Sequence, residues 1–328
     1  MYRVVITTEA LRELPGPHLD VLHAGGFEVG YPAKTVLLTE DDTLAALQGF
    51  AAVIAGSEPY TDRVLAELPQ LRIISRNGVG YDRIDVPAAT RRGVAVTITP
   101  EGNHQAVAEH TMALLLAVSR SIVLSAAETR AGLWRRRNVH IPLRGKTLGI
   151  VGLGRIGRSV AVRGAAFGMR LVACEQYPDG EFVRQFNVEL TDLDSLLAAS
   201  DFVTLHTPMG PATSELINRR TLELMKRGSV LVNTARGGLV NESDLLEALK
   251  SGHLAGAGLD VLVEEPPPPD HPLLALENVV VSPHVAALDT QAIEDMSVGA
   301  AQNIVDAFRG QWPKGALVNP DVTATWQR

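Results

Sequence analysis

Short apolar runs alternate with helical patterns along this chain, and they fall into two separate blocks. Strands that alternate with helices are typical of βαβ units, whose strands form parallel sheets. The first block predicts strands at Arg3–Ile6, Phe27–Gly30, Ala52–Ala55, Leu71–Ser75 and Val94–Val96. The second block predicts strands at Thr147–Val151, Arg170–Cys174, Phe202–Leu205, Val230–Asn233, Ala257–Val261 and Val279–Ser282. The chain is therefore predicted to be an α/β protein with two doubly wound parallel sheets.

Longer helical patterns separate and follow the two blocks. An Ala- and Leu-rich segment predicts a helix at His104–Ser121, which continues after a break through Ala126–Ala131. Another helix is predicted at Thr290–Arg309, after the last strand. We expect this last helix to pack back on the first block, so the first domain is discontinuous, with bounds 1–102 and 286–328. The second domain is then 103–285, and it includes the helix and arm that follow the first block.

Composition narrows the classes of partner. Cys174 is the only cysteine in 328 residues, which excludes an intramolecular disulfide and fits a reducing cytoplasm. The formal net charge of −7 disfavours nucleic acid and anionic membranes as partners. The longest apolar stretch, Met112–Val118, is too short to span a bilayer. One tight basic run, Arg135–Arg137, is interpreted as a solvated helix end. We therefore expect a cytoplasmic protein without a nucleic-acid or membrane partner.

A glycine-rich loop opens the second block. The segment Gly152–Gly157 has the pattern GxGxxG, follows the predicted strand Thr147–Val151 directly, and opens a helical stretch that runs to Phe167. In this context the first glycine permits a tight turn, the second lets the backbone approach a pyrophosphate, and the third allows close helix–strand packing. The phosphates then lie at the positive end of the helix dipole. The alternative interpretation is an ordinary tight turn.

An acid at the end of the next strand indicates which dinucleotide is bound. Glu175 lies eighteen residues after Gly157. A carboxylate there accepts hydrogen bonds from ribose hydroxyls and repels a 2′-phosphate, which favours NAD over NADP. The alternative is a solvated acid at the end of a strand.

Three residues whose side chains are suited to catalysis follow later strands of the second block. Arg236, Glu265 and His284 come after the strands predicted at Val230–Asn233, Ala257–Val261 and Val279–Ser282. Because the carboxyl ends of parallel strands meet at one edge, we expect these side chains beside the glycine loop. A guanidinium grips a carboxylate with two parallel bonds, an imidazole exchanges a proton, and an adjacent carboxylate favours the imidazolium. Each residue taken alone is also explained as ordinary polar surface.

With these motifs the sequence resembles the D-isomer-specific 2-hydroxyacid dehydrogenases, which include phosphoglycerate, glycerate/hydroxypyruvate and D-lactate dehydrogenases. The segments that carry the resemblance are Asn77–Asp82, Val107–His110, Gly152–Gly157, His206–Pro208, Asn233–Gly238, Gly258–Val261, Glu265–Pro266 and Ser282–His284. The resemblance implies a flavodoxin-like substrate domain, a Rossmann NAD-binding domain, a cleft between them, and a homodimer formed largely through the NAD-binding domain. It also implies oxidoreductase activity on a small 2-oxo or 2-hydroxy acid.

The resemblance assigns roles to individual residues. Arg236, Glu265 and His284 are the implied catalytic trio. Substrate would be held by Asn77, by the Val79 and Gly80 amides and by Arg236, while Asp260 would bind the nicotinamide carboxamide. The full set of cofactor-binding residues is predicted to be Gly152, Gly154, Arg155, Ile156, Gly157, Glu175, His206, Thr207, Pro208, Thr234, Ala235 and Asp260. No metal site is predicted.

Several positions narrow the substrate. Formate dehydrogenases of this superfamily carry a glutamine where this chain has Glu265, which disfavours formate. Phosphoglycerate dehydrogenases often carry an arginine after the third strand, where this chain has Ala55–Tyr60 with Glu58, an acid that opposes a phosphate. Arg76, or Arg135 reaching across a dimer interface, remains a source of positive charge. The sequence therefore favours a hydroxypyruvate/glyoxylate-type substrate and leaves 3-phosphoglycerate as the alternative.

A different class of function shares this scaffold. The C-terminal-binding corepressors resemble the same family and act as NAD-responsive protein-interaction modules. The absence of an appended tail in this sequence speaks against that interpretation, and turnover of 2-oxo acids with NADH would separate the two. A hydrolase or methyltransferase is disfavoured because the chain has no GxSxG, no HExxH and no metal-ligand cluster.

Overall fold

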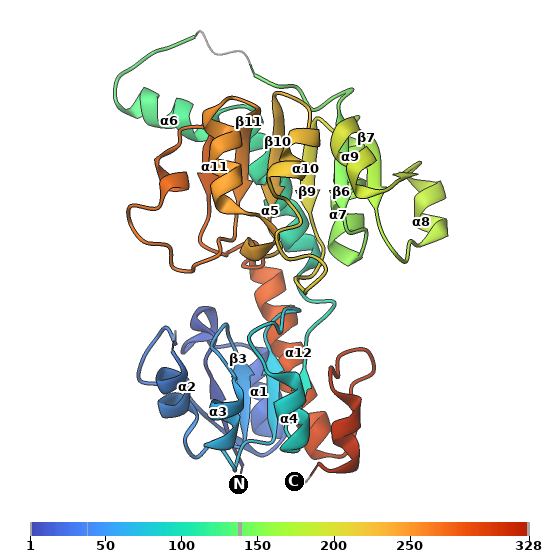
Figure 1. Ribbon diagram of the computed structural model, residues 1–328. Coiled ribbons are helices and arrows are strands. Elements are labelled where there is room, and N and C mark those ends of the chain that lie inside the picture. Colours follow the sequence, from blue (N-terminus) through green and yellow to red (C-terminus); the bar gives the residue numbers. More distant parts are fainter. Residues whose placement is uncertain (1, 38, 137–139, 327–328) are drawn as a thin grey trace. The chain divides into compact units, whose positions relative to one another are not determined.

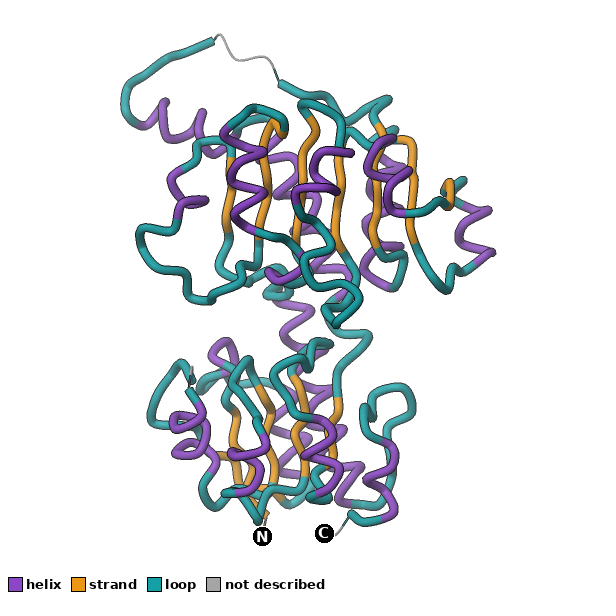
Figure 2. Tube along the Cα trace, viewed as in Figure 1, coloured by secondary structure: helices purple, strands orange, loops and turns teal. Residues whose placement is uncertain are grey.

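The computed structural model describes residues 2–37, 39–136 and 140–326, so Arg137 of the basic run lies outside the described residues. The chain forms two compact units, Met1–Asn103 with Ala287–Arg328 and His104–Ala286. Both units are layered α/β structures in which helices cover the two faces of a parallel sheet, as Figures 1 and 2 show. The fold class predicted from the sequence is confirmed.

The first unit contains a five-stranded parallel sheet. Its strands are β1 (Tyr2–Ile6), β2 (Phe27–Gly30), β3 (Ala52–Ala55), β4 (Ile73–Arg76) and β5 (Ala95–Thr97). Their spatial order is β2-β1-β3-β4-β5, the flavodoxin-like order. All five lie where the apolar runs predicted strands, with ends that differ by at most two residues.

Helices cover both faces of this sheet. They are α1 (Pro17–Ala24), α2 (Glu40–Leu47), α3 (Asp62–Ala66), α4 (Val86–Arg91) and α12 (Thr290–Phe308). Alternation along β1 sends Val4 and Ile6 toward Leu22 of α1 and Ile304 of α12, while Val5 faces the core under α2, α3 and α4. The helix that follows the last strand therefore packs on the first block.

The second unit contains a seven-stranded parallel sheet in the order β12-β11-β10-β9-β6-β7-β8. The strands are β6 (Thr147–Val151), β7 (Arg170–Cys174), β8 (Glu189–Leu190), β9 (Phe202–Leu205), β10 (Ser229–Asn233), β11 (Leu254–Leu259) and β12 (Val279–Val281). This is the Rossmann order with one strand added after the sixth. The two-residue strand β8 is one more than the sequence predicted. β11 also ends earlier than predicted, so Asp260 follows the strand instead of lying within it.

The helices of the second unit are α5 (His104–Ser119), α6 (Ile122–Arg130), α7 (Arg155–Ala166), α8 (Gly180–Gln185), α9 (Leu193–Ala199), α10 (Arg219–Leu224) and α11 (Glu242–Lys250). α5 and α7 cover one face of the sheet, where Leu115 and Val160 lie in the same core as Ile150. α9, α10 and α11 cover the other face, where Leu245 lies in the same core as Leu231. Short 3-10 turns lie at Glu9–Leu11, Gly237–Leu239, Pro272–Ala275 and Pro320–Ala324.

The long helical pattern between the blocks is broken. α5 ends at Ser119 and α6 begins at Ile122, with a bend of 61° at the break. Ser121 has a φ of 48°, a left-handed conformation that interrupts the helical hydrogen bonds. In the described part of the chain no single helix is long and apolar enough to cross a membrane, and the bent pair α5–α6 meets that test by length and composition only.

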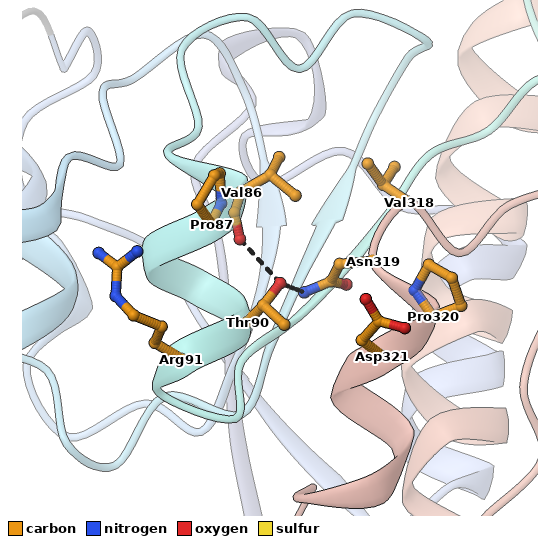
Figure 3. Close-up of a pocket in the computed structure, with 8 residues that line it drawn as sticks. All are labelled: Val86, Pro87, Thr90, Arg91, Val318, Asn319, Pro320 and Asp321. Atoms are coloured by element: carbon orange, nitrogen blue, oxygen red, sulfur yellow. Dashed lines mark hydrogen bonds between the residues drawn. The ribbon is translucent and has the colours of Figure 1, made fainter.

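A hollow of about 450 Å³ lies on the first unit beside strand β5, and Figure 3 shows its lining. The lining residues are Val86, Pro87, Thr90, Arg91, Val318, Asn319, Pro320 and Asp321. Its central amide, that of Asn319, is already bonded: it donates to the Thr90 hydroxyl and the Val94 carbonyl and accepts from the Val96 N–H. The hollow therefore marks where the C-terminal segment is tied to β5, and none of the predicted site residues lines it.

Candidate active site

The predicted site residues of the second unit share one edge of its sheet. Because all seven strands are parallel, their carboxyl ends meet at that edge. Following the spatial order of the strands, the edge carries His284 after β12, Glu265 after β11, Arg236 after β10, His206 after β9, the glycine loop Gly152–Gly157 after β6 and Glu175 after β7. The winding of the chain thus brings together residues that are far apart in sequence.

His284 and Glu265 form a hydrogen-bonded pair. The distance from His284 Nδ1 to Glu265 Oε2 is 2.7 Å, and Glu265 Oε1 accepts the Leu262 N–H at 3.0 Å. Burial alone would raise the pKa of Glu265, but the hydrogen bond and charge of His284 and the Leu262 N–H outweigh it, so the pKa is lowered. An ionised carboxylate on Nδ1 requires a proton there, which leaves Nε2 as the nitrogen that takes up or releases a proton.

The backbone at His284 is held in an uncommon conformation. Its φ is 55°, in the left-handed region that non-glycine residues rarely occupy. Asp260 fixes this loop: its carbonyl accepts the His284 N–H at 2.8 Å, and its carboxylate accepts the N–H groups of Val285 at 3.0 Å and Ala286 at 2.9 Å. Such strain persists only where surrounding contacts over-determine it. The imidazole is therefore placed by backbone bonds as well as by Glu265.

A polar network supports Asp260 from α5. His110 Nε2 lies 2.8 Å from Ser282 Oγ and 3.4 Å from Asp260 Oδ1, and the Ser282 hydroxyl donates to Asp260 Oδ1 at 2.6 Å. Asp260 is 1% exposed; burial would raise its pKa, but the bonds from His110, Ser282 and the backbone lower it. Residue-by-residue reasoning assigned no role to His110 or Ser282, although both lie in the segments that carry the family resemblance. In this network the Asp260 carboxylate holds the loop that carries His284. A contact between Asp260 and the nicotinamide stays a prediction.

Arg236 lies in a loop that is fixed at both ends. The amide of Asn233 donates to the Arg236 carbonyl at 2.8 Å and accepts the Ala235 N–H at 3.0 Å. After it, Gly237 packs against the loop that follows β11: a Cβ on Gly237 would stand 2.0 Å from the Leu262 carbonyl carbon. Only glycine permits this close approach, which joins the Arg236 loop to the loop that carries Glu265.

The glycine loop has the geometry that a dinucleotide needs. Gly152 has a φ of 92°, and a Cβ there would lie 2.7 Å from the His206 carbonyl oxygen. A Cβ on Gly157 would lie 2.0 Å from the Gly152 oxygen, so the loop folds tightly onto the start of α7. At Gly154, by contrast, a Cβ would meet nothing within 4 Å, and no side chain caps the N-terminus of α7 there. The open space at a helix N-terminus fits a pyrophosphate.

Glu175 lies beside that loop. Its Oε2 accepts the Leu153 N–H at 2.7 Å, and its Oε1 accepts the Tyr177 N–H at 3.0 Å. A carboxylate has about four lone-pair sites, so both oxygens keep capacity for ribose hydroxyls. The charge stands directly beside the glycine loop, where it would repel a 2′-phosphate.

The remaining predicted cofactor residues differ in exposure. Thr207 and Ala235 are half-buried and Pro208 is exposed. Thr234 is 8% exposed, and its hydroxyl pairs with that of Thr111 on α5. His206 Nε2 lies 2.6 Å from the Thr204 hydroxyl, and burial lowers the pKa of His206 to about 3, so the ring is neutral at physiological pH.

The predicted substrate loop belongs to the first unit. Asn77, Val79 and Gly80 follow β4 at the carboxyl edge of its sheet. The loop is tied at two places: Arg76 Nε donates to the Gly80 carbonyl at 2.7 Å, and the Gly78 N–H donates to Thr99 Oγ1 at 2.9 Å. Arg236, Glu265 and His284 lie in the second unit.

Comparisons with known proteins decide the family. A family model described as "D-isomer specific 2-hydroxyacid dehydrogenase, NAD binding domain" matches residues 112–286. The chain belongs to this family. The chain is 44% identical to a glyoxylate reductase of Thermofilum pendens over 95% of its own length and 94% of that protein. It is 40% identical to a D-3-phosphoglycerate dehydrogenase of Archaeoglobus fulgidus over 93% of this chain, but it spans only 58% of that relative's length.

Solved structures agree with this assignment. The crystal structure of the TT0316 protein from Thermus thermophilus is 40% identical, with a TM-score of 0.87 over 96% of this chain and 99% of that one. The second unit contains the family's NAD-binding domain, so the predicted family and the NAD cofactor are confirmed. Among the described residues, no group of three or more His, Cys, Asp and Glu side chains is placed to hold a metal ion.

Proposed function

We propose that this dehydrogenase interconverts a small D-2-hydroxy acid and its 2-oxo acid. The observation that carries the proposal is the 2.7 Å pair of His284 and Glu265, at the same sheet edge as Arg236 and the glycine loop. Such an edge unites a proton donor, a cation for a carboxylate and a dinucleotide site, which together are what reduction of a 2-oxo acid requires.

Each side chain has a distinct role in the proposed reaction. NADH, when bound along the glycine loop and Glu175, supplies the hydride for the carbonyl carbon. Arg236 and the backbone amides of Val79 and Gly80 hold the substrate carboxylate. His284 donates the Nε2 proton to the carbonyl oxygen as the alcohol forms, and it takes the proton back in the reverse direction. Glu265 stabilises the imidazolium and keeps the ring oriented through Nδ1.

The two units divide this work. We assign substrate binding to Met1–Asn103 with Ala287–Arg328, and NAD binding to His104–Ala286. The described chain also offers a surface for a second copy, because α6 buries none of its residues and leaves Ile122 and Val123 53% and 55% exposed. Trp134, just beyond α6, is 81% exposed. Apolar exposure of this kind marks interaction sites, which supports a homodimer formed through this segment.

Arg135 is engaged within its own arm. Its Nη1 donates to Glu128 Oε1 at 2.6 Å. This bond would have to break for the guanidinium to reach the site of a second copy. A cytoplasmic location is supported by the composition: the chain's single cysteine, Cys174, is half-buried and free.

Two substrate classes remain in view, because the relatives are named both glyoxylate reductase and D-3-phosphoglycerate dehydrogenase. The test is NADH oxidation, followed by absorbance, with glyoxylate, pyruvate, hydroxypyruvate and 3-phosphohydroxypyruvate. At least one of them should be reduced. His284→Ala should lower turnover by about 10²- to 10⁴-fold, the usual contribution of a positioned acid–base group. His23→Ala, which changes an exposed histidine on α1, should leave turnover unchanged.

Two results would count against the proposal. Near-normal turnover in His284→Ala would remove this residue as the proton donor. Binding of NADH without reduction of any of the four acids would favour the NAD-responsive interaction module instead.

A further inference from the structure

Glu265 lies in a loop of the second unit, residues 263–272 and here called the proline loop, that has few anchors of its own. These residues are all described, and none of them is buried; Val263 is 63% exposed. The segment Pro266–Pro269 consists of consecutive prolines. Proline has no backbone N–H, so this run cannot donate hydrogen bonds to the rest of the protein. The contacts that place Glu265 must therefore come from the residues on either side of the prolines.

One carboxylate bonds to both sides of the proline run. Glu242 Oε1 accepts the Val263 N–H at 2.9 Å, before the prolines. Glu242 Oε2 lies 3.2 Å from His271 Nε2, after them. The side chains of Glu242 and His271 are only 20% and 13% exposed, so this pair is largely shielded from solvent. Glu242 thereby closes the proline loop at its two ends.

His271 depends on this bond for the orientation of its ring. Its Nδ1 is buried and has no hydrogen-bond partner in the described part of the chain. An ionised carboxylate only accepts hydrogen bonds, so Nε2 carries a proton that faces Glu242. The backbone of His271 continues the closure: its N–H donates to the Pro268 carbonyl and its carbonyl accepts the Leu274 N–H, both at 3.0 Å. Leu273, which is 1% exposed, then fixes the chain in the core of the second unit.

Glu242 itself lies on a well-anchored helix. It is the first residue of α11, whose Leu245 and Leu249 are buried in the core on one face of the sheet. Asn241 caps this helix by accepting the Asp244 N–H at 3.1 Å. A negative charge in the first turn of a helix is favourable, because the N-terminus of the helix dipole is positive. The Glu242 carboxylate therefore stands at a fixed point, from which it holds a loop without buried anchors.

The contact to Val263 lies directly beside the contacts of Glu265. The Val263 N–H, which Glu242 accepts, follows the Leu262 N–H in the chain. Glu265 Oε1 accepts that Leu262 N–H at 3.0 Å, and Glu265 Oε2 lies 2.7 Å from His284 Nδ1. Glu242 thus fixes one peptide group while Glu265 bonds to the peptide group before it. A shift of the Val263 peptide would therefore move the Glu265 carboxylate relative to His284.

We propose that Glu242 and His271 are positioning residues, which hold the proline loop so that the Glu265 carboxylate stays on His284 Nδ1. This inference rests on the proposed dehydrogenase function, in which that carboxylate stabilises the imidazolium. Neither Glu242 nor His271 touches the reacting atoms, and both act through Glu265. Removing the Glu242 carboxylate should therefore weaken the proton donor most at alkaline pH, where protonation of His284 depends most on the charge of Glu265.

The test measures kcat/KM at about pH 6 and about pH 9, with NADH and the 2-oxo acid that the unaltered protein reduces fastest. Glu242→Ala should lower the ratio of the activity at the higher pH to that at the lower pH by about three- to tenfold, up to the effect of losing the Glu265 charge itself. His271→Phe keeps a ring but removes the Nε2 bond, and it should lower the same ratio. Glu247→Ala is the control: this exposed acid on α11 pairs with Arg219, and its loss should leave the ratio unchanged.

Two further variants separate positioning from a direct effect of the Glu242 charge. Glu242→Gln removes the charge but keeps an oxygen for the Val263 N–H, so it should recover most of the activity that Glu242→Ala loses. Equal losses in the two variants would overturn the positioning role. In a Glu265→Gln background there is no charge left to position, so adding Glu242→Ala should not change the ratio further. A further fall in that background would also overturn the proposal.

The outcomes also separate this inference from the wider function. An unchanged ratio in Glu242→Ala, whether or not the overall activity falls, would overturn the positioning role and leave the dehydrogenase intact. No reduction of any 2-oxo acid by the unaltered protein would overturn the proposed function and this inference with it. If thermal unfolding shows that Glu242→Ala does not fold, His271→Phe decides: an unchanged ratio in that variant overturns the proposal.

Discussion

Replacing Glu265 by glutamine should move the pH dependence of reduction without abolishing it. Glutamine keeps an oxygen opposite His284 Nδ1 but removes the charge that stabilises the imidazolium. The carboxylate is ionised throughout the neutral range, because its pKa lies below the usual value for glutamate. Since reduction needs the protonated ring, losing the charge means that activity declines at a lower pH than in the unaltered protein.

The size of the shift follows from the geometry. Two unit charges about 4 Å apart interact by roughly 1 kcal/mol in water and roughly 4 kcal/mol at an effective dielectric constant of about 20. The His284 and Glu265 side chains are 44% and 34% exposed, so solvent screening places the pair in the lower half of that range, at about 1–2 kcal/mol. Because 1.36 kcal/mol corresponds to a factor of ten in rate, kcat/KM on the alkaline side of the profile should fall by about tenfold.

The assay is kcat/KM for reduction of a 2-oxo acid, measured from about pH 5 to 10 by NADH absorbance. Glu264→Gln is the matched control, because this neighbouring glutamate is exposed and its charge is screened. A midpoint that stays in place in Glu265→Gln, or that moves to higher pH, would refute the reasoning. So would an equal shift in the control.

Two further predictions concern stability and cofactor binding. Burial lowers the pKa of His206 from 6.5 to about 3, so as the pH falls below 6.5 the unfolded chain binds a proton that the folded chain does not, and stability falls. The loss of stability should reach about 2 kcal/mol at pH 5. Calorimetry at pH 7 and pH 5 should therefore show a smaller decrease in Tm for His206→Gln than for the unaltered protein. Equal decreases would contradict this prediction. Gly154→Ala should fold normally but weaken NADH binding at least tenfold, because the methyl enters the open space at the start of α7. Gly157→Ala should instead lower Tm, since its methyl would meet the Gly152 oxygen at 2.0 Å. If Gly154→Ala bound NADH as tightly as the unaltered protein, the open space at Gly154 would not be part of the cofactor site.

Local patterns sufficed for much of the architecture. Apolar runs located every strand except β8, a two-residue edge strand whose residues are both exposed and so leave no hydrophobic pattern. The glycine loop was recognisable because its spacing reflects a local turn, and its open N-terminus at α7 agrees with that interpretation. The pairing of His284 with Glu265 was also predictable, because parallel strands always deliver their carboxyl ends to the same edge.

Other features of the site exist only in the folded chain. His110 and Ser282 are 172 residues apart, and nothing in either local sequence indicates that they meet over Asp260. The sequence placed Glu58 after a strand as an acid that opposes phosphate, but only the packing of β1 against β3 shows that it is buried and bonded to Thr7. Periodicity and turn chemistry are recorded in neighbouring residues, so the sequence alone determined the elements and their order. Hydrogen-bond partners and desolvation depend on which distant segments come into contact, so only the tertiary structure decided them.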